Sequence, residues 1–174
     1  SAYIPTNVIS ITDGQIFLES DLFFSGMRPA VNVGLSVSRV GGAAQTKAMK
    51  KAAGSIRIDL AQFREMEVFA SDLDNATKEQ LQHGHVLMEL LKQPLCRPLS
   101  MAEQVMTLCA ANGRVMLDVP VNQVKDFQMK YLDYMKEQHS DIVRQLETTK
   151  ALDDELNKQI CDAATEFKKE FLQK

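Results

Sequence analysis

The chain has 174 residues, of which 45% are apolar and 25% are charged, and this composition suits one medium domain or one small domain plus part of another. Its 20 Lys and Arg residues stand against 23 Asp and Glu residues, so the formal net charge is −3 and no surface that attracts nucleic acid or anionic lipid is predicted. No stretch approaches the roughly 18 consecutive apolar residues that can span a bilayer. The chain opens with Ser-Ala-Tyr-Ile-Pro and has no start methionine, so we expect it to be a piece of a larger protein.

The amino-terminal segment has the composition of strands and loops. It holds most of the glycine, and it carries short β-branched runs from Val8 to Thr12 and from Val31 to Val37, with Asp13-Gly14 marking a turn. The composition changes near Gly54, where a helical period takes over. We therefore expect a first domain over residues 1–54 and a second over residues 55–174.

The second part of the chain has the pattern of a helical bundle. Apolar residues recur at three- and four-residue steps along several segments, and these predict buried helix faces: Ile56, Leu60, Phe63, Met66 and Phe69; Val124, Phe127, Tyr131 and Met135; Leu156, Ile160, Ala163, Phe167 and Phe171. Pro94 and Pro98 end one helix, and Ser100 with Glu103 forms a capping box that begins the next. The predicted fold is mostly α, a carboxy-terminal helical bundle preceded by a few strands.

The sequence carries no motif for self-sufficient catalysis. It lacks a Gly-rich phosphate loop with Lys and Ser/Thr, a nucleophile elbow and a paired-histidine metal motif. His83 and His85 are two positions apart, so on a helix they diverge and cannot share a metal. No metal site is predicted.

One segment is different in kind. From Met27 to Lys47 the chain reads Met-Arg-Pro-Ala-Val-Asn-Val-Gly-Leu-Ser-Val-Ser-Arg-Val-Gly-Gly-Ala-Ala-Gln-Thr-Lys, and this resembles the alpha subunit of F-type ATP synthases almost residue for residue. The resemblance continues upstream through Ile4 to Gln15 and downstream in the runs at residues 48–51, 61–65, 71–74 and 90–93. The pattern Val37-Ser38-Arg39-Val40 favours alpha over the related catalytic beta subunit.

The resemblance implies a fold and an assembly. The first residues would be the closing strands of an α/β P-loop nucleotide-binding domain, and the helical domain would follow them. The chain would then be part of the non-catalytic alpha subunit of a rotary, proton-transporting ATP synthase. Its partners would be the beta subunit, in an alternating hexamer, and the central gamma rotor. It would lie on the cytoplasmic face of the bacterial plasma membrane and contact the membrane only through the rest of the complex.

The resemblance also implies a catalytic role for Arg39, as an arginine finger that enters the catalytic site of the adjacent beta subunit. A planar, permanently charged guanidinium can donate two hydrogen bonds to the phosphoryl group in transfer. Ser36 falls at a position that the family needs for activity. Ser10 lies in the expected strand from Val8 to Thr12, and we expect a supporting role for it or an ordinary backbone hydrogen bond.

Further residues match nucleotide and rotor positions of the family. Arg28, Pro29 and Gln93 match positions around the adenine of the alpha subunit's own non-catalytic site, which would bind ATP or ADP with Mg²⁺ in the full subunit. The family commonly has a second glutamine two residues after Gln93, where this chain has Leu95, so the resemblance does not establish adenine selectivity there. Asp72 and Asp74 match the turn that faces the rotor, or they simply cap a helix.

Two other classes of function stay open from the sequence. A stand-alone helical interaction module would leave Arg39 dispensable. A related hexameric motor that moves along RNA would also use arginine fingers, although the acidic balance and the 6% aromatic content argue against a nucleic-acid track. We expect the chain by itself to be inactive in every case, because it lacks the phosphate loop.

Overall fold

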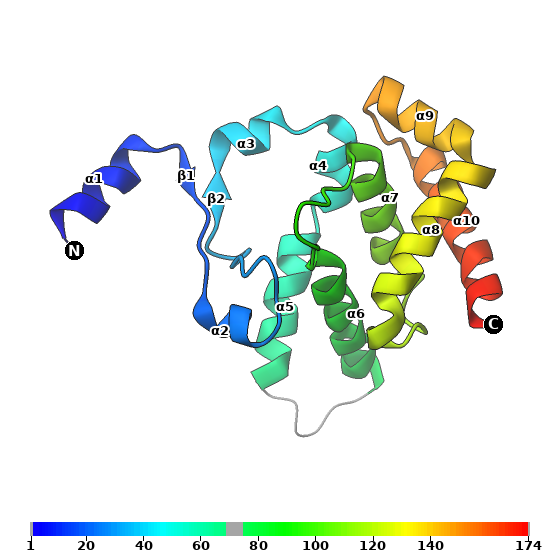
Figure 1. Ribbon diagram of the computed structural model, residues 1–174, viewed down its shortest axis with the longest axis horizontal. Helices are drawn as coiled ribbons and strands as arrows, with labels where there is room; N and C mark the ends of the chain where they lie inside the picture. Colours follow the sequence, from blue (N-terminus) through cyan, green and yellow to red (C-terminus); the bar gives the residue numbers. More distant parts are fainter. Residues whose placement is uncertain (1, 69–74, 174) are drawn as a thin grey trace. The chain divides into compact units, whose positions relative to one another are not determined.

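The computed structural model describes residues 2–68 and 75–173 (Figure 1). Its internal contacts divide the chain into two compact units, Ser1–Gln45 and Thr46–Lys174. The expected mostly α fold with a few short strands is confirmed, since helices make up most of the second unit and most of the regular secondary structure of the first.

The first unit is small and has little core. In chain order it contains α1 (Tyr3–Ile11), β1 (Gly14–Gln15), α2 (Ser20–Phe24), β2 (Val37–Ser38) and α3 (Arg39–Ala44). The two strands pair antiparallel, with Gly14 opposite Ser38 and Gln15 opposite Val37. Its buried residues are Met27, Ala30 and Asn32. Since so few side chains are buried, hydrogen bonds contribute much of the stability of this unit.

The strand predicted from Val8 to Thr12 is wrong, because this run belongs to α1 and its carboxy-terminal cap. No residue of α1 is buried, and a strand would need hydrogen-bonded neighbours that the described residues do not offer here. A helix closes its backbone hydrogen bonds within the segment. Of the second expected strand, from Val31 to Val37, only the two ends form β structure. Val31 makes an isolated bridge, and Val37 belongs to β2.

The second unit is a helical bundle. It contains α4 (Lys47–Ala53), α5 (Ile56–Val68), α6 (Asn75–Leu91), α7 (Met101–Asn112), a short 3-10 turn η1 (Val121–Gln123), α8 (Val124–Gln138), α9 (Ser140–Thr149) and α10 (Asp154–Leu172). Helix α7 packs against α4, α6, α8, α9 and α10. Small buried residues on α7, Ala102, Ala110 and Ala111, let its neighbours approach closely.

Local signals for helix ends are confirmed in this unit. The Ser100 hydroxyl accepts from the Glu103 amide at 3.2 Å, and the Glu103 carboxylate accepts from the Ser100 amide at 2.6 Å, which completes the capping box of α7. Gly113 caps the other end of α7. Asp153 caps α10 by accepting from the Leu156 amide at 2.7 Å.

The core of this unit is rich in aromatic rings from α8 and α10. Phe127 and Tyr131 are both 0% exposed. The ring of Phe127 lies 5.2 Å from the rings of Phe167 and Phe171, centre to centre. The expected faces of both helices are therefore the buried ones. Phe69 of the earlier expected face lies outside the described residues.

Helix α4 belongs to the bundle. The Ala48 amide donates to the Lys150 carbonyl at 3.0 Å, and the Asn112 side chain donates to the Ala52 carbonyl at 2.7 Å. The compact units thus divide at Gln45, ahead of the boundary expected at Gly54, which caps the end of α4. Where the domains of the whole protein divide stays a prediction.

Gly84 marks a close approach of α6 to α5. A Cβ atom at this position would overlap the ring of Phe63. We expect Gly84→Ala to lower the free energy of unfolding by about 1–3 kcal/mol despite the better helix propensity of alanine, because the buried Phe63 ring has to move. Urea denaturation of the chain measures the change. The exposed Glu79→Ala, on the same helix, should shift stability by less than about 0.5 kcal/mol, and an equal shift in both variants would contradict the steric account.

Candidate functional site

Arg39 is the first residue of α3 and directly follows β2. Its side chain is exposed, and it takes part in none of the ion pairs found among residues 2–68 and 75–173. The preceding residue, Ser38, is the N-cap of α3 and accepts a hydrogen bond from the Gly41 amide at 2.9 Å. The guanidinium is therefore free to meet an outside group, while its backbone is held at the start of a helix.

Asp13 anchors the turn that carries Arg39. Its carboxylate accepts from the Ser38 hydroxyl at 2.7 Å and from the Val40 amide at 3.1 Å. The Ser38 hydrogen bond holds the pKa of the Asp13 carboxyl below its usual value, and the Val40 amide and the Arg39 charge act in the same direction. The carboxylate also lies at the positive end of α3. Sequence reasoning assigned Asp13 only to a turn, because its partners lie far along the chain.

The strand pairing beneath this turn requires a glycine. A Cβ atom at Gly14 would overlap the Val37 carbonyl, so only glycine lets β1 approach β2 this closely. This contact sets Gly14 opposite Ser38 and brings the preceding residue, Asp13, within hydrogen-bond distance of the Ser38 hydroxyl. The Asp13-Gly14 pair, predicted as a turn, thus supplies both the close approach and the anchor.

Removing the charge of Asp13 tests this anchor. Asp13→Asn should speed amide hydrogen exchange at Val40 and Gly41 by up to about tenfold, because the charge that strengthens the hydrogen bonds from the Ser38 hydroxyl and the Val40 amide is lost. The pKa of Asp13 is lowered in the folded chain, so its stabilisation is complete above the unfolded pKa and is lost as pH falls through the lowered value. Exchange measured by NMR near neutral pH reports the effect. Asp21→Asn, in the first turn of α2, should leave these two amides unchanged, and protection retained in Asp13→Asn would refute the anchor.

Ser36 links two segments of this unit through hydrogen bonds. Its hydroxyl donates to the Asn32 carbonyl at 2.6 Å and accepts from the Phe17 amide at 3.0 Å. Asn32 is 6% exposed, and its side chain donates to the Glu19 carboxylate at 2.6 Å. These bonds join the segment before α2 to the segment before β2. Ser36 therefore helps to fix the backbone of the segment that leads to β2 and Arg39.

Ser10 takes no part in these hydrogen bonds. It is an exposed residue of α1, and its hydroxyl donates to the Asn7 carbonyl at 2.8 Å. The strand position expected for it is not found. Its part in catalysis stays a prediction.

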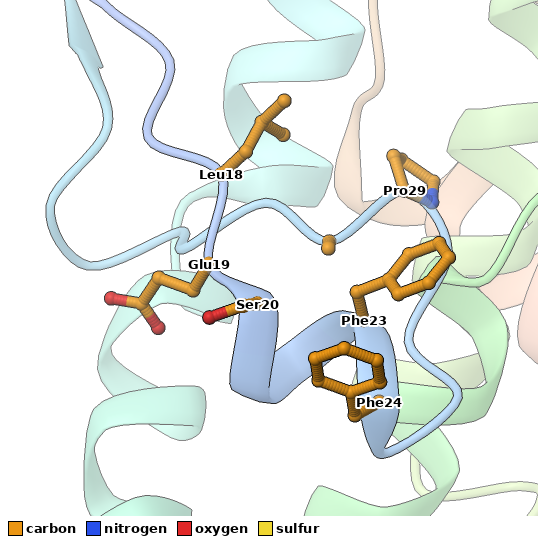
Figure 2. Close-up of a pocket in the computed structure, with 7 residues that line it drawn as sticks. Leu18, Glu19, Ser20, Phe23, Phe24 and Pro29 are labelled. Carbon is orange, nitrogen blue, oxygen red and sulfur yellow. The ribbon is translucent and has the colours of Figure 1, made fainter.

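A second feature of the first unit is a pocket beside α2 (Figure 2). Its volume is about 440 Å³, and Leu18, Glu19, Ser20, Phe23, Phe24, Pro29 and Ala30 line it. The Arg28 guanidinium carbon lies 4.7 Å from the centre of the Phe23 ring, within the range of a cation–π contact. Pro29 thus lines a largely apolar pocket with two aromatic walls, and Arg28 contacts the Phe23 ring that forms one of these walls.

Gln93 lies in the second unit, after the end of α6. It lines a smaller cavity of about 90 Å³ between α5, α6, α7 and α8. Leu95, which replaces the expected glutamine, is 91% exposed. Asp72 and Asp74 lie outside the described residues.

Comparison with known proteins identifies the family. A model described as the ATP synthase alpha/beta chain, C terminal domain, matches residues 45–167, and a model of the nucleotide-binding domain of the ATP synthase alpha/beta family matches residues 1–38. The chain belongs to the ATP synthase alpha/beta family. The family assignment accounts for both units, since the two models meet close to the division at Gln45.

Three relatives in this family are ATP synthase alpha subunits. The ATP synthase subunit alpha of Clostridium kluyveri is 53% identical over 175 residues, which cover 99% of this chain and 35% of the relative. That of Petrotoga mobilis is 54% identical over 170 residues, covering 96% of this chain and 34% of the relative. That of Lawsonia intracellularis is 52% identical over 175 residues, covering 99% and 35%. The chain spans about a third of the length of these ATP synthase alpha subunits.

Two further features of the described residues bear on their chemistry. Within residues 2–68 and 75–173, no helix is long and apolar enough to cross a membrane. The same described residues contain no group of three His, Cys, Asp or Glu side chains that could hold a metal ion.

Proposed function

We propose that the chain forms part of the alpha subunit of a rotary, proton-transporting F-type ATP synthase and supplies Arg39 to the catalytic site of an adjacent beta subunit. One observation carries the proposal: Arg39 is exposed and without an ion pair among the described residues, while Asp13 and Ser38 fix its backbone at the start of α3. An arginine held this way is prepared for an anionic group that another subunit provides.

The chemistry of phosphoryl transfer needs such a group. Charge spreads over the equatorial oxygens of the transferred phosphoryl, and a guanidinium can donate two parallel hydrogen bonds to them. Anchoring the backbone beforehand reduces the conformational entropy lost when the side chain engages. The chain supplies a charge to the neighbouring site and needs no nucleophile or base of its own.

The pocket beside α2 supports the second half of the proposal, a non-catalytic ATP site. Two phenylalanine rings and Pro29 offer flat apolar surfaces to a purine base, and Arg28 is held over Phe23 at the pocket's edge. A role for Gln93 in binding the base rests on the resemblance alone. Mg²⁺ and the phosphates would be held by the part of the subunit that these residues do not span.

The assembly follows from the same proposal. Beta subunits would alternate with alpha in a hexamer around a gamma rotor, and Asp72 and Asp74 would face that rotor. The complex would sit peripherally on the cytoplasmic face of the bacterial plasma membrane. The net charge of −3 gives no electrostatic reason for this subunit to bind nucleic acid or lipid directly.

Binding of a transition-state mimic tests the finger. In hexamers reassembled from full-length subunits, ADP with Mg²⁺ and aluminium fluoride mimics the transferred phosphoryl group. We expect Arg39→Ala to abolish tight trapping of this mimic at the catalytic sites while ADP binding stays within a few-fold, because the arginine acts mainly on the transition state. Equal loss of ADP and of the mimic would indicate a role in assembly or ground-state binding, and unchanged trapping would refute the proposal.

A further inference from the structure

Asn32 is a buried polar residue in the first unit, where few side chains are buried. It is 6% exposed. Its side-chain oxygen accepts from the Leu35 amide at 3.0 Å, and its side-chain nitrogen donates to the Glu19 carboxylate at 2.6 Å. A buried amide that lost one of these partners would have no water to replace it, so each hydrogen bond contributes to holding the local fold.

These hydrogen bonds act where the strand pairing of the first unit is interrupted. Leu18 pairs with Val31 in an isolated bridge, and β1 pairs with β2 further along the same two segments. Between the two pairings, residues 16–17 stand opposite the longer segment 32–36, which forms a turn. The backbone groups of such a turn need partners outside the strand pairing. The Asn32 side chain supplies one of these partners.

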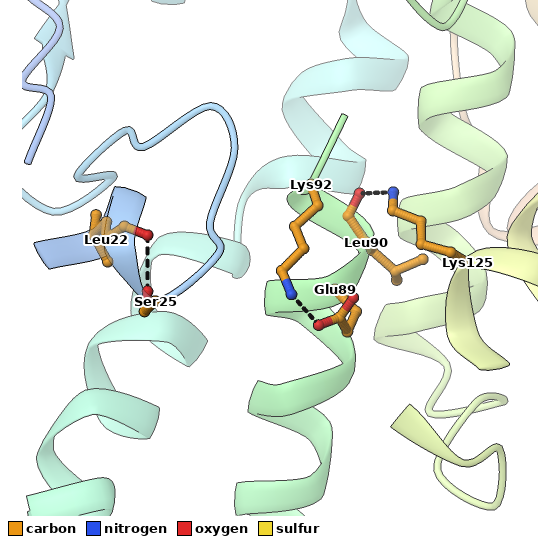
Figure 3. A network of polar contacts seen from close by, with 6 residues as sticks. All are labelled: Leu22, Ser25, Glu89, Leu90, Lys92 and Lys125. Carbon is orange, nitrogen blue, oxygen red and sulfur yellow. Dashed lines mark hydrogen bonds and ion pairs between the residues drawn. The ribbon is translucent and has the colours of Figure 1, made fainter. Parts of the chain in front are cut away.

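Glu19, which accepts from Asn32, is itself held in place. Its amide donates to the Ala30 carbonyl at 3.0 Å, and it is the N-cap residue of α2. At the other end of α2, the Ser25 hydroxyl donates to the Leu22 carbonyl at 2.8 Å (Figure 3). The Glu19 carboxylate therefore offers Asn32 an acceptor whose position is fixed by its backbone.

The turn that Asn32 closes leads directly to Arg39. The Asn32 carbonyl accepts from the Ser36 amide at 3.0 Å and from the Ser36 hydroxyl at 2.6 Å. Ser36 directly precedes β2, and Arg39 directly follows it. Asp13 holds the other end of β2 through Ser38. With both ends of the strand fixed, the arginine that follows it can project in few directions.

We propose that Asn32 is a positioning residue for Arg39: its hydrogen bond to Glu19 fixes the turn that leads to β2, and thereby the backbone from which the guanidinium reaches the neighbouring catalytic site. This inference rests on the proposed role of Arg39. Asn32 touches no nucleotide and acts only through the turn. All the residues that carry the inference lie in the first unit.

Asn32→Asp tests the hydrogen bond to Glu19. The substitution keeps the side-chain oxygen that accepts from Leu35, but it replaces the donor to Glu19 by a second carboxylate oxygen, and two carboxylates in contact repel each other. In hexamers of full-length subunits, we expect kcat for ATP hydrolysis to fall about tenfold while KM stays within about twofold, because a misplaced guanidinium mainly loses its contacts in the transition state. Steady-state ATPase kinetics measure both.

A swapped pair and a matched control accompany this variant. The double variant Asn32→Asp with Glu19→Gln reverses donor and acceptor, so kcat should return to within about threefold of the unchanged protein. Asn122→Asp makes the same chemical change at an exposed residue of η1 and should leave kcat unchanged. A swapped pair that stays as slow as Asn32→Asp alone would contradict a role for this hydrogen bond.

A double-mutant cycle with Arg39 separates positioning from a general structural role. If Asn32 acts through Arg39, Asn32→Asp should lower kcat by less than about twofold in hexamers that already carry Arg39→Ala. An equal fall in both backgrounds, or an unchanged kcat in Asn32→Asp alone, would overturn the positioning role and leave the role of Arg39 standing. A normal kcat in Arg39→Ala alone would contradict the proposed function, and this inference with it.

Hydrogen exchange of the full-length subunit decides the matter if hexamers of Asn32→Asp do not assemble. Peptides that cover residues 36–41 should exchange at least about threefold faster in Asn32→Asp than in the unchanged subunit, because the turn before β2 opens more often. The swapped pair with Glu19→Gln should return the exchange to the unchanged rate. Equal exchange in all three subunits, measured by mass spectrometry, would overturn the positioning role.

Discussion

Arg39→Ala should lower kcat for ATP hydrolysis by the reassembled hexamer by about a thousandfold, which corresponds to about 4 kcal/mol of transition-state stabilisation. The reason is electrostatic: the guanidinium is exposed, unpaired among the described residues, and held at the start of α3 by Asp13 and Ser38. Alanine removes both its charge and its paired donors. Steady-state ATPase kinetics on hexamers of full-length subunits measure the change.

Two controls separate this effect from others. Arg39→Lys keeps the charge but not the planar pair of donors, so its turnover should fall between those of the unchanged protein and Arg39→Ala. Arg144→Ala removes an exposed arginine of α9 and should leave turnover unchanged. Near-normal kcat in Arg39→Ala, with hexamers fully assembled, would mean that another group stabilises the transition state.

Phe127→Ala should lower the free energy of unfolding of the helical unit by about 3–5 kcal/mol, the range found for truncating a large buried ring. Phe127 is 0% exposed and lies 5.2 Å from the rings of both Phe167 and Phe171 and 6.1 Å from that of Tyr131. Its loss opens a cavity between α8 and α10 that neighbouring rings cannot fill without leaving their own contacts. Urea denaturation followed by circular dichroism gives the change.

Phe171→Ala is the matched control for this core position. Phe171 contacts the same Phe127 ring from the last turns of α10 but is only partly buried, so its truncation should cost clearly less. Tyr131→Phe provides a further check, because the Tyr131 hydroxyl is buried and has no hydrogen-bond partner among the described residues; its removal should cost little or stabilise the unit. Equal losses of unfolding free energy in Phe127→Ala and Phe171→Ala would mean that Phe127 is not at the centre of the core.

The helical unit was largely predictable because its signals are local. The spacing of Phe127 and Tyr131 and the capping box at Ser100 each act within one or two helical turns, and the structure confirms both. The first unit was less predictable from its sequence, because a β-branched run forms a strand only beside other strands. From Val8 to Ile11 the chain is helical instead.

For the candidate site too, the sequence predicts some residues and misses others. Arg39, Arg28 and Pro29 came from a resemblance to a family, and the structure adds their surroundings: an anchored helix start and an aromatic pocket. Asp13 was missed as an anchor, since its partners Ser38 and Val40 lie on a segment distant in sequence. Hydrophobic periodicity and short motifs carry no signal for such pairs.

The most direct test of the central claim is a structure of the reassembled hexamer of full-length subunits with ADP, Mg²⁺ and aluminium fluoride at the catalytic sites. The account predicts that the Arg39 guanidinium lies within hydrogen-bond distance of the fluoride ligands in the neighbouring subunit's site, with Asp13 still bonded to Ser38 and Val40. A guanidinium turned away from that site, with another residue donating to the fluorides, would contradict it.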